Sequence, residues 1–353
     1  MHLNHPSGEK VVRDIVDTVW EEPEGIADQT LGDGQFSLPG LVDSHVHFAA
    51  PIGEDWQTDP YEKTVERASK ALAAGVLLAF DKGWSNLNTV RLLDEVPPGD
   101  RPEIEAAGVI NAVPEGYWPD FARELTDETF DDGIDQSIEE GRGWVKLIGD
   151  WPRRGRGPVA NFSESRLADV VTRATASSAR VAIHTMARDV PGAAVRAGVH
   201  SIEHGLFLTE DDLADLGARG GMWVPTIIRM EAVVDQLGAE STGGRLILEG
   251  LANVRRLMPL AAEAGVLLLA GTDVTVGAHD VALEAQQIVR YGLPAENALR
   301  AVSGDGCRAA HRDDPFAVGS PADVVIFDVN PIEELGALSH PAKVVRLGRV
   351  VQA

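Results

Sequence analysis

Two histidines that are one residue apart carry the first chemical signal in the sequence. His45 and His47 lie in the segment LPGLVDSHVHF, at the end of an apolar run with the length of a β-strand. Side chains at positions i and i+2 of a strand point to the same face, so these two imidazoles could share one cation. A strand that merely ends in two polar residues is the alternative, and short motifs also match by accident. The spacing alone leaves both interpretations open.

Three further polar residues end other apolar runs and favour the metal interpretation. His184 closes RVAIHT, His204 closes IEH, and Asp273 closes VLLLAGTD. If these runs are strands of one parallel barrel, their carboxyl ends converge on a single opening. Histidine and aspartate are common ligands of divalent metals. Four histidines and one aspartate at strand ends therefore predict a shared metal site.

The elements that would position these residues are β/α units. From Leu41 onward, short apolar runs alternate with amphipathic stretches, which is typical of a parallel sheet covered by helices. Eight such units predict an α/β fold of the (β/α)8 TIM-barrel type. The runs are LVDSHVHF, VLLAFDKG, EIEAAGVI, WVKLIGD, RVAIHT, SIEHG, MWVPTI and VLLLAGTD.

Both flanks of the barrel have a different pattern. Residues 10–38 and residues from about 316 to 353 show short alternating strands with turns, which indicates one small β-sandwich formed from both termini,. We therefore expect residues 1–40 to form the N-terminal part of the sandwich and residues 41–315 to form the barrel. Residues 316–353 would complete the sandwich.

Composition restricts the partners. A formal net charge of −24 would repel a phosphate backbone, so we expect a small-molecule substrate and no nucleic acid,. The segment MHLNHPSGEKVVRD has no apolar leader and later apolar runs are short, so we expect a cytoplasmic protein without a membrane partner,. The single cysteine, Cys307, cannot build a thiolate metal cluster,. A homo-oligomer stays open.

Together these segments resemble the amidohydrolase superfamily, and within it the branch related to imidazolonepropionases and metal-dependent prolidases. The resemblance covers nearly the whole chain. It rests on PGLVDSHVH, HTMARDVPGAAVRAGVHSIEHG, AGTD and the closing VGSPADVVIFD. It implies a hydrolase with two divalent metal ions, for which zinc is the expected metal.

Lys146 is the remaining candidate ligand. It ends the fourth run, in GWVKLIGD, among apolar residues that make a charged ammonium costly to bury,. A lysine whose ammonium reaches the surface is the alternative. The resemblance implies instead that CO2 carboxylates Lys146 and that the carbamate bridges two ions. Burial assists this reaction because only the neutral amine attacks CO2.

The resemblance also implies how the ligands are shared and which residue moves the proton. Asp273 would accept a proton from the attacking hydroxide and pass it to the leaving nitrogen. One ion would be held by His45, His47 and Asp273, and the other by His184 and His204, with carboxylated Lys146 between them.

Candidate substrate contacts lie just beyond the strand ends. The loop GDWPRRGRGP follows the fourth run, and guanidinium groups suit a substrate carboxylate, although a solvated loop is the alternative,. Aromatic side chains in such positions are expected to form pocket walls. The predicted substrate-binding residues are Arg153, Arg154, Arg156, Tyr117, Trp151, Arg229 and His279.

These features predict a hydrolase that cleaves an amide C–N bond with a metal-bridging hydroxide. The substrate would be a dipeptide, an N-acyl amino acid or a cyclic amide. Superfamily deaminases commonly carry a glutamate three residues after the strand-five histidine, and the residue here is Ala187, which argues against deamination. Hydrolysis of an ester, lactone or carbamate, a mononuclear site, and a noncatalytic barrel that only binds stay open as alternatives.

Overall fold

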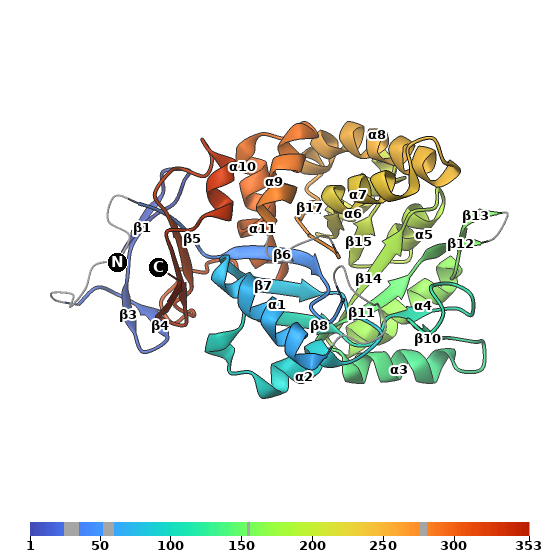
Figure 1. The fold of residues 1–353 in the computed structure, drawn as a ribbon, viewed down its shortest axis with the longest axis horizontal. Coiled ribbons are helices and arrows are strands. Elements are labelled where there is room, and N and C mark those ends of the chain that lie inside the picture. The colour runs from blue at the N-terminus through green and yellow to red at the C-terminus, as the bar shows by residue number, and fades with distance from the viewer. Residues whose placement is uncertain (25–34, 52–59, 154–155, 275–280, 353) are drawn as a thin grey trace.

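The protein is described by a computed structural model that covers residues 1–24, 35–51, 60–153, 156–274 and 281–352. Its main body is a sheet of parallel strands that curls into a barrel with helices outside it (Figure 1). Each of the eight predicted runs forms a strand, and these strands are neighbours in chain order. They are β6 (Leu41–Val46), β7 (Val76–Asp81), β8 (Glu103–Ala107), β11 (Gly143–Ile148), β14 (Arg180–Thr185), β15 (Ser201–His204), β16 (Met222–Val224) and β17 (Leu267–Leu268).

Backbone hydrogen bonds between β6 and the segment after β17 close the barrel. The amide of Ser44 donates to the carbonyl of Ala270 at 2.8 Å, and the amide of Asp273 donates to the carbonyl of His45 at 2.6 Å. Because β17 contains only two residues, these bonds are what bring Asp273 beside the histidines of β6. The predicted (β/α)8 fold class is confirmed.

Helices cover the outside of the barrel, as expected for parallel strands buried on both faces. α6 begins with a capping box, in which Thr209 and Asp212 exchange hydrogen bonds between side chain and backbone,. The helices are α1 (Tyr61–Ala73), α2 (Asn88–Glu95), α3 (Phe130–Glu140), α4 (Glu164–Ala176), α5 (Val190–Arg196), α6 (Glu210–Ala218), α7 (Ile227–Leu237), α8 (Thr242–Glu263), α9 (Val281–Arg290), α10 (Ala295–Ala301) and α11 (Gly304–Ala309). Two 3₁₀ turns are η1 (Pro98–Asp100) and η2 (Leu335–Ser339).

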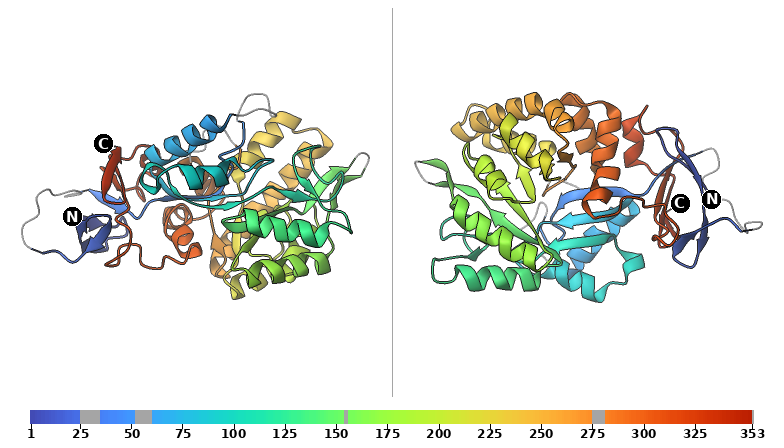
Figure 2. Two further views of the ribbon diagram at one scale, coloured as in Figure 1. Left: turned by 90° about the horizontal axis from the view of Figure 1, so that it is seen from below. Right: turned by 180° about the vertical axis from the view of Figure 1, so that it is seen from behind.

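Strands from both termini gather at one end of the molecule, where both chain ends lie (Figures 1 and 2). Buried Trp20 packs there with apolar side chains from residues 322–326 and Val345. The division of the chain at residues 40 and 316 stays a prediction. The paired strands are β1 (His2–Asn4) with β2 (Lys10–Val12), β3 (Asp14–Val16) with β4 (Val19–Glu21), and a four-stranded antiparallel sheet in the order β20 (Arg349–Gln352), β19 (Lys343–Arg346), β18 (Val324–Phe327) and β5 (Phe36–Leu38).

Further short strands lie beyond the carboxyl ends of the barrel strands. β12 (Asp150–Arg153) and β13 (Gly157–Ala160) form an antiparallel hairpin directly after β11, at the end of the molecule opposite the termini (Figure 1). β9 (Asn111–Ala112) pairs with β10 (Arg123–Glu124) and continues the line of β8. Among the helices that the structure describes, none is both long enough and apolar enough to cross a membrane.

Candidate metal centre

Because side chains alternate along a strand, the polar residues at the carboxyl ends of the strands face the inside of the barrel. They lie next to apolar residues that fill its interior. Trp144 and Ala182 belong to the apolar cluster inside the barrel. Lys146 and His184 follow them by two residues on β11 and β14, so their side chains have the same inward direction. The local period of the strand therefore explains why both residues face the barrel interior at its carboxyl end.

β6 departs from this simple alternation. Val42 belongs to the same interior cluster, yet His45, three residues later, also faces the interior and lies beside Glu203 of β15. The pairing of β6 with β7 shifts register between Asp43 and Val46. Such irregularities redirect side chains and are common next to active sites. The shift is the local reason that His45 reaches the barrel axis.

Three ligand atoms from His45, His47 and Asp273 converge on one small volume. The two Nε2 atoms are 3.2 Å apart, and Oδ1 of Asp273 is 3.8 Å from Nε2 of His45 and 3.4 Å from Nε2 of His47. Two nitrogens bound tetrahedrally to one zinc ion at about 2.1 Å are separated by about 3.4 Å. The donor set and its spacing therefore fit one divalent cation.

The outer nitrogen of each of these histidines already faces an acceptor. Nδ1 of His45 is 2.6 Å from Oε2 of Glu203, and Nδ1 of His47 is 2.5 Å from the carbonyl oxygen of Gly83. Two atoms that both lack a proton would repel each other at this distance, so Nδ1 carries the proton in both rings. The Nε2 lone pairs are thus left for a metal.

His184 and His204 form a second pair beside the first. Nε2 of His204 is 2.9 Å from Nδ1 of His184, and the His204 ring centroid is 5.5 Å from that of His45. Oγ1 of Thr226 donates to the carbonyl of Pro225 and lies 2.6 Å from Nδ1 of His204. The hydroxyl therefore accepts the His204 proton, so Nε2 of His204 carries no proton and faces Nδ1 of His184.

Burial keeps the imidazoles of His45, His184 and His204 neutral. It lowers the pKa of His45 to about 4 and that of His204 to about 3. The pKa of His184 lies well below its ordinary value, chiefly because of burial and then because of the neighbouring His204. A metal needs a neutral imidazole, so these three rings would not have to lose a proton to bind one at neutral pH.

Lys146 lies in the same enclosed space. It is 2% exposed, and its Nζ has no hydrogen-bond partner among the residues that the structure describes. Burial lowers the pKa of its amine, and its charge would interact with His45, His184 and Asp273. An unpartnered buried amine of lowered pKa is a suitable target for CO2. These observations fit the predicted carbamate.

Two buried aspartates fix the backbone behind the ligands. Asp43 accepts hydrogen bonds from the amide of His45 at 3.2 Å and from the amide and hydroxyl of Thr272 at 3.1 and 2.6 Å. Asp81 accepts from the amides of Phe48 and Gly83, each at 2.8 Å. The segments that carry the ligands are thereby tied to one another.

Three residues of this site also have a strained backbone. His204, Thr226 and Asp273 have φ values of 63°, 47° and 54°, in the left-handed region that residues with a Cβ atom rarely adopt,. Such conformations cost about 1–3 kcal/mol each and cluster at functional sites, where the surrounding structure maintains them. Their presence supports a functional role for this end of the barrel.

An arc of aromatic rings runs from one histidine pair to the other. Trp151 of the β12–β13 hairpin is 6.2 Å from His184 and 4.6 Å from Tyr117, measured between ring centroids. Trp84 closes the other end of the arc, 5.3 Å from His47. Trp118 and Phe121 lie between these ends, with centroids 5.9 Å apart. The arc forms an apolar wall beside the candidate metal centre.

Arg229 brings a cation to the same opening. Its Nε is 4.0 Å from Oδ2 of Asp273, and its side chain is 14% exposed. Tyr117 interacts electrostatically with both Arg229 and Asp273, and burial raises the pKa of its hydroxyl. Tyr117, Trp151 and Arg229 therefore lie next to the predicted ligands.

The two arginines of the hairpin that the structure describes differ in their surroundings. Nη2 of Arg153 donates to Oδ1 of Asn161 at 3.1 Å, and Arg156 is exposed to solvent. Arg154 and His279 lie outside the described residues. The structure thus places Arg153 and Arg156 in the β12–β13 hairpin, and their contact with substrate stays a prediction.

Two residues near the predicted ligands were not predicted from sequence: Lys82, which pairs with Glu203, and Thr226, which contacts His204. Lys82 follows Phe80 by two residues, so strand alternation alone could have placed it on the inner face,. Thr226 follows a strand end in the segment VPT, which carries no distinctive signal for its contact with His204.

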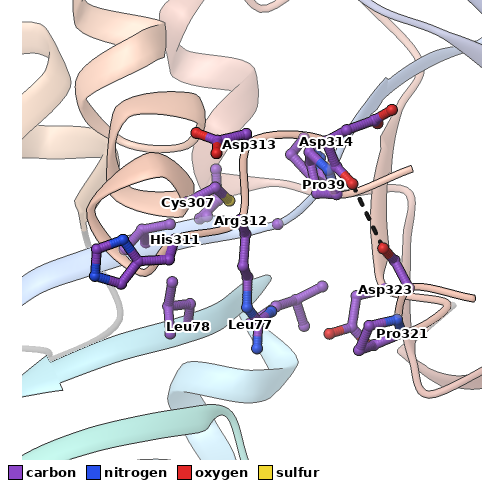
Figure 3. A pocket seen from close by; sticks show the side chains of 15 residues that line it. Pro39, Leu77, Leu78, Cys307, His311, Arg312, Asp313, Asp314, Pro321 and Asp323 are labelled. Atoms are coloured by element: carbon purple, nitrogen blue, oxygen red, sulfur yellow. Dashed lines mark hydrogen bonds between the residues drawn. The ribbon is translucent and has the colours of Figure 1, made fainter. Parts of the chain in front are cut away.

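A separate cavity lies at the other end of the barrel. It has a volume of about 290 Å3 and lies between the first residues of β6 and β7 and the chain that follows α11. Figure 3 shows Arg312 extending across it toward Leu77. None of the predicted ligands lines it, and in TIM barrels this face serves stability instead of catalysis,.

Comparisons with known proteins identify a family and several similar proteins. A model of the amidohydrolase family matches residues 36–351. An uncharacterised protein of Mycobacterium tuberculosis is 33% identical over 338 residues, which cover 93% of this chain and 88% of that protein. Ochratoxinase of Aspergillus niger is 26% identical over 254 residues, or 67% of this chain and 52% of that enzyme. A solved Xaa-Pro dipeptidase with bound methionine has a TM-score of 0.80 and 22% identity, covering 98% of this chain and 94% of its own.

Proposed function

We propose a specific reaction from the premise that the chain belongs to the amidohydrolase family and is a hydrolase. The reaction is metal-dependent cleavage of an amide C–N bond in a dipeptide, an N-acyl amino acid or a cyclic amide. The observation that carries the proposal is the convergence of His45, His47 and Asp273 on one volume, with the pair His184 and His204 beside it.

Two divalent ions, with zinc as the expected metal, would be held by these residues. His45, His47 and Asp273 would hold the first ion, and His184 and His204 the second. Carboxylated Lys146 would lie between them, since its buried amine has no other hydrogen-bond partner in the described chain. When bound, the two ions would acidify a water molecule and polarise the substrate carbonyl.

Asp273 would move the proton in this reaction. Its Oδ1 faces both histidines of the first group, while its Oδ2 is turned toward Arg229. A carboxylate in this position can accept a proton from the attacking water and deliver it to the leaving nitrogen. Arg229 would hold a substrate carboxylate near that nitrogen.

The surroundings of the site support a substrate with one apolar part and one anionic part. The aromatic arc from Trp151 to Trp84 offers an apolar wall, and Arg229 offers a cation on the side of Asp273. A dipeptide or an N-acyl amino acid combines both features. The similarity to a Xaa-Pro dipeptidase agrees with this choice.

Metal analysis tests the proposal directly. Protein purified after growth with ample zinc should contain about two divalent ions per chain. His47→Asn should lose metal, whereas His340→Ala, which changes an exposed histidine, should not. One ion per chain would support the mononuclear alternative. No ion, even after metal is added, would refute the metal-dependent mechanism.

Lys146→Ala tests the bridging role of the carbamate. We expect lower metal occupancy and loss of amide hydrolysis with an unchanged far-ultraviolet circular dichroism spectrum. Acetate should partly restore both, because a short carboxylate can occupy the space that the side chain leaves. In wild-type protein supplied with 13C-labelled CO2, carbon NMR should show a carbamate signal that Lys146→Ala lacks. Full metal content and full turnover in Lys146→Ala would rule the bridge out.

A further inference from the structure

Lys82 is a buried lysine that the proposed reaction leaves without a role. It directly follows β7 and is 1% exposed. Its amide donates to the carbonyl of Val46 at 2.8 Å, so its backbone is tied to the end of β6. A buried ammonium group is costly unless it is paired, and the group that pairs with it therefore indicates its function.

The partner of Lys82 is Glu203, which is completely buried. Nζ of Lys82 is 3.4 Å from Oε1 of Glu203 and 3.7 Å from the ring centroid of Trp144. The hydroxyl of Ser201 donates to the same carboxylate oxygen at 2.6 Å. Lys82 and Ser201 thus share Oε1, and the second oxygen of Glu203 is left for another contact.

That second contact is with a predicted ligand. Oε2 of Glu203 is 2.6 Å from Nδ1 of His45. A carboxylate in contact with the outer nitrogen of a metal-binding histidine sets the tautomer and the orientation of the ring. Lys82 therefore reaches His45 through one intervening side chain.

The residue after Lys82 supports the other histidine of the same group. The carbonyl oxygen of Gly83 is 2.5 Å from Nδ1 of His47. Gly83 has a φ of +75°, and a Cβ atom there would lie 2.2 Å from the carbonyl oxygen of Gly108. Only glycine fits this backbone, so the short segment after β7 is built to present the Gly83 carbonyl and the Lys82 side chain together.

We propose that Lys82 is a positioning residue of the metal centre: its ammonium group fixes the Glu203 carboxylate, and Glu203 holds the His45 ring with Nε2 directed at the first ion. The inference rests on the proposed function, since it presumes that His45 binds metal. It also distinguishes the two buried lysines. A carbamate on Lys82 would lie against the Glu203 carboxylate and be repelled, so Lys82 keeps its ammonium group and Lys146 takes up CO2.

Lys82→Met tests this role by removing the charge while keeping a chain of similar length. Metal-free protein would be titrated with Zn2+ in competition with a chromophoric chelator. We expect wild-type protein to bind two ions and Lys82→Met to bind one of them about 10- to 100-fold more weakly, the usual effect of losing a residue that orients a ligand. In 15N-histidine NMR of the metal-free proteins, His45 should carry its proton on Nδ1 in wild type and lose this single tautomer in the variant.

Arg346→Met is the matched control. Arg346 is buried and forms an ion pair with buried Asp323 among the terminal strands, away from the proposed ligands. Removing one partner of a buried ion pair destabilises a protein in either place. Both variants should therefore unfold at a lower temperature, but Arg346→Met should keep wild-type affinity for both ions and the wild-type His45 tautomer.

A double variant, Lys82→Met with Glu203→Gln, covers the case in which Lys82→Met does not fold. It leaves no unpaired buried charge at this position, so it should fold, and it should still bind one ion about 10- to 100-fold more weakly. Wild-type affinity for both ions in either Lys82 variant, with an unchanged His45 tautomer, would overturn the proposed role of Lys82. It would leave the proposed function standing. Absence of metal binding by wild-type protein would instead overturn the proposed function.

Discussion

The two carboxylate oxygens of Asp273 face different groups: one faces two imidazoles and the other faces a guanidinium. Oδ1 lies within 3.8 Å of both histidines of β6, while Oδ2 lies 4.0 Å from the guanidinium of Arg229. Its φ of 54° is one of the strained conformations at the site. Neighbouring backbone and side chains thus hold one carboxylate where it could bind a metal and also exchange a proton with substrate.

Replacing this carboxylate separates the two roles. Asp273→Asn keeps the size of the side chain and an oxygen for the metal but removes the basic oxygen. We expect kcat for amide hydrolysis to fall by at least about 100-fold, the usual effect of losing general acid–base catalysis. Metal content, measured on the same sample, should fall much less than turnover. Near-normal kcat with full metal occupancy would contradict the proposed role.

The β12–β13 hairpin is the element that combines the aromatic and the basic features of the candidate pocket. Trp151 packs against Tyr117 and lies near His184, while Arg153 is tied to Asn161 at the end of the hairpin. Nδ2 of Asn161 donates to the carbonyls of Gly116 and Ile148, at 2.9 and 2.8 Å. The hairpin is thereby fastened to β11 and to the loop after β9.

Charge removal from the hairpin tests its contact with substrate. Replacing Arg153, Arg154 and Arg156 together by alanine should raise KM several-fold for an anionic substrate and leave kcat nearly unchanged, as expected for lost ground-state binding. A neutral analogue should be nearly unaffected. An equal rise in KM for both substrates would show that the hairpin has collapsed.

The matched control for this variant removes the same charge elsewhere. Arg245, Arg256 and Arg308 are exposed on helices α8 and α11, so their joint replacement by alanine changes the net charge equally. If this control raises KM for the anionic substrate as much as the hairpin variant does, the effect comes from the overall charge of the protein and not from the hairpin.

Buried carboxyl groups make the stability of the whole molecule depend on pH. Burial raises the pKa of Asp43 to about 7, that of Asp150 to about 7 and that of Glu284 to about 8. In each case the folded protein holds the proton more tightly than the unfolded chain does. The stabilisation is complete below about pH 4, the unfolded value, and is lost as the pH rises through these folded-state values.

Asp150→Asn tests this dependence. Oδ2 of Asp150 accepts from the amides of Met186 and Ala187 at 2.8 and 2.9 Å, and an asparagine oxygen can accept both bonds. The free energy of unfolding in urea would be measured between about pH 5 and pH 8 on metal-free protein. Comparing the variant with wild type isolates Asp150 from the buried histidines, whose lowered pKa acts in the opposite direction,. Over this range, the free energy of unfolding of wild type should fall relative to that of Asp150→Asn by on the order of 2 kcal/mol, because the variant has no carboxyl group that releases its proton.

The control for the pH experiment is Glu263→Gln, which changes an exposed carboxylate on α8. Its pH profile should run parallel to that of wild type. If Asp150→Asn also runs parallel to wild type, then the carboxyl group of Asp150 does not hold its proton more tightly in the folded protein, and the proposed origin of the pH dependence is wrong.

The sequence by itself determined the strands and the residues that end them. Apolar runs bounded by polar residues are a local property, so all eight barrel strands could be placed from the sequence, and the position of His184 and Lys146 at the ends of two runs predicted that they lie at the carboxyl end of the barrel,. Identification of the family depended on the same segments, and it is confirmed over residues 36–351.

Only the tertiary structure decided which side chains meet across the barrel. Lys82 directly follows β7 and Glu203 lies on β15, two strands that are not neighbours in the sheet, so their contact depends on how the barrel closes. The register shift in β6 that directs His45 to Glu203 is likewise absent from any local pattern. Hydrophobic periodicity records which face of a strand is buried, but the distance between two inward side chains is set by strand order, tilt and register, which arise only when all strands pack together.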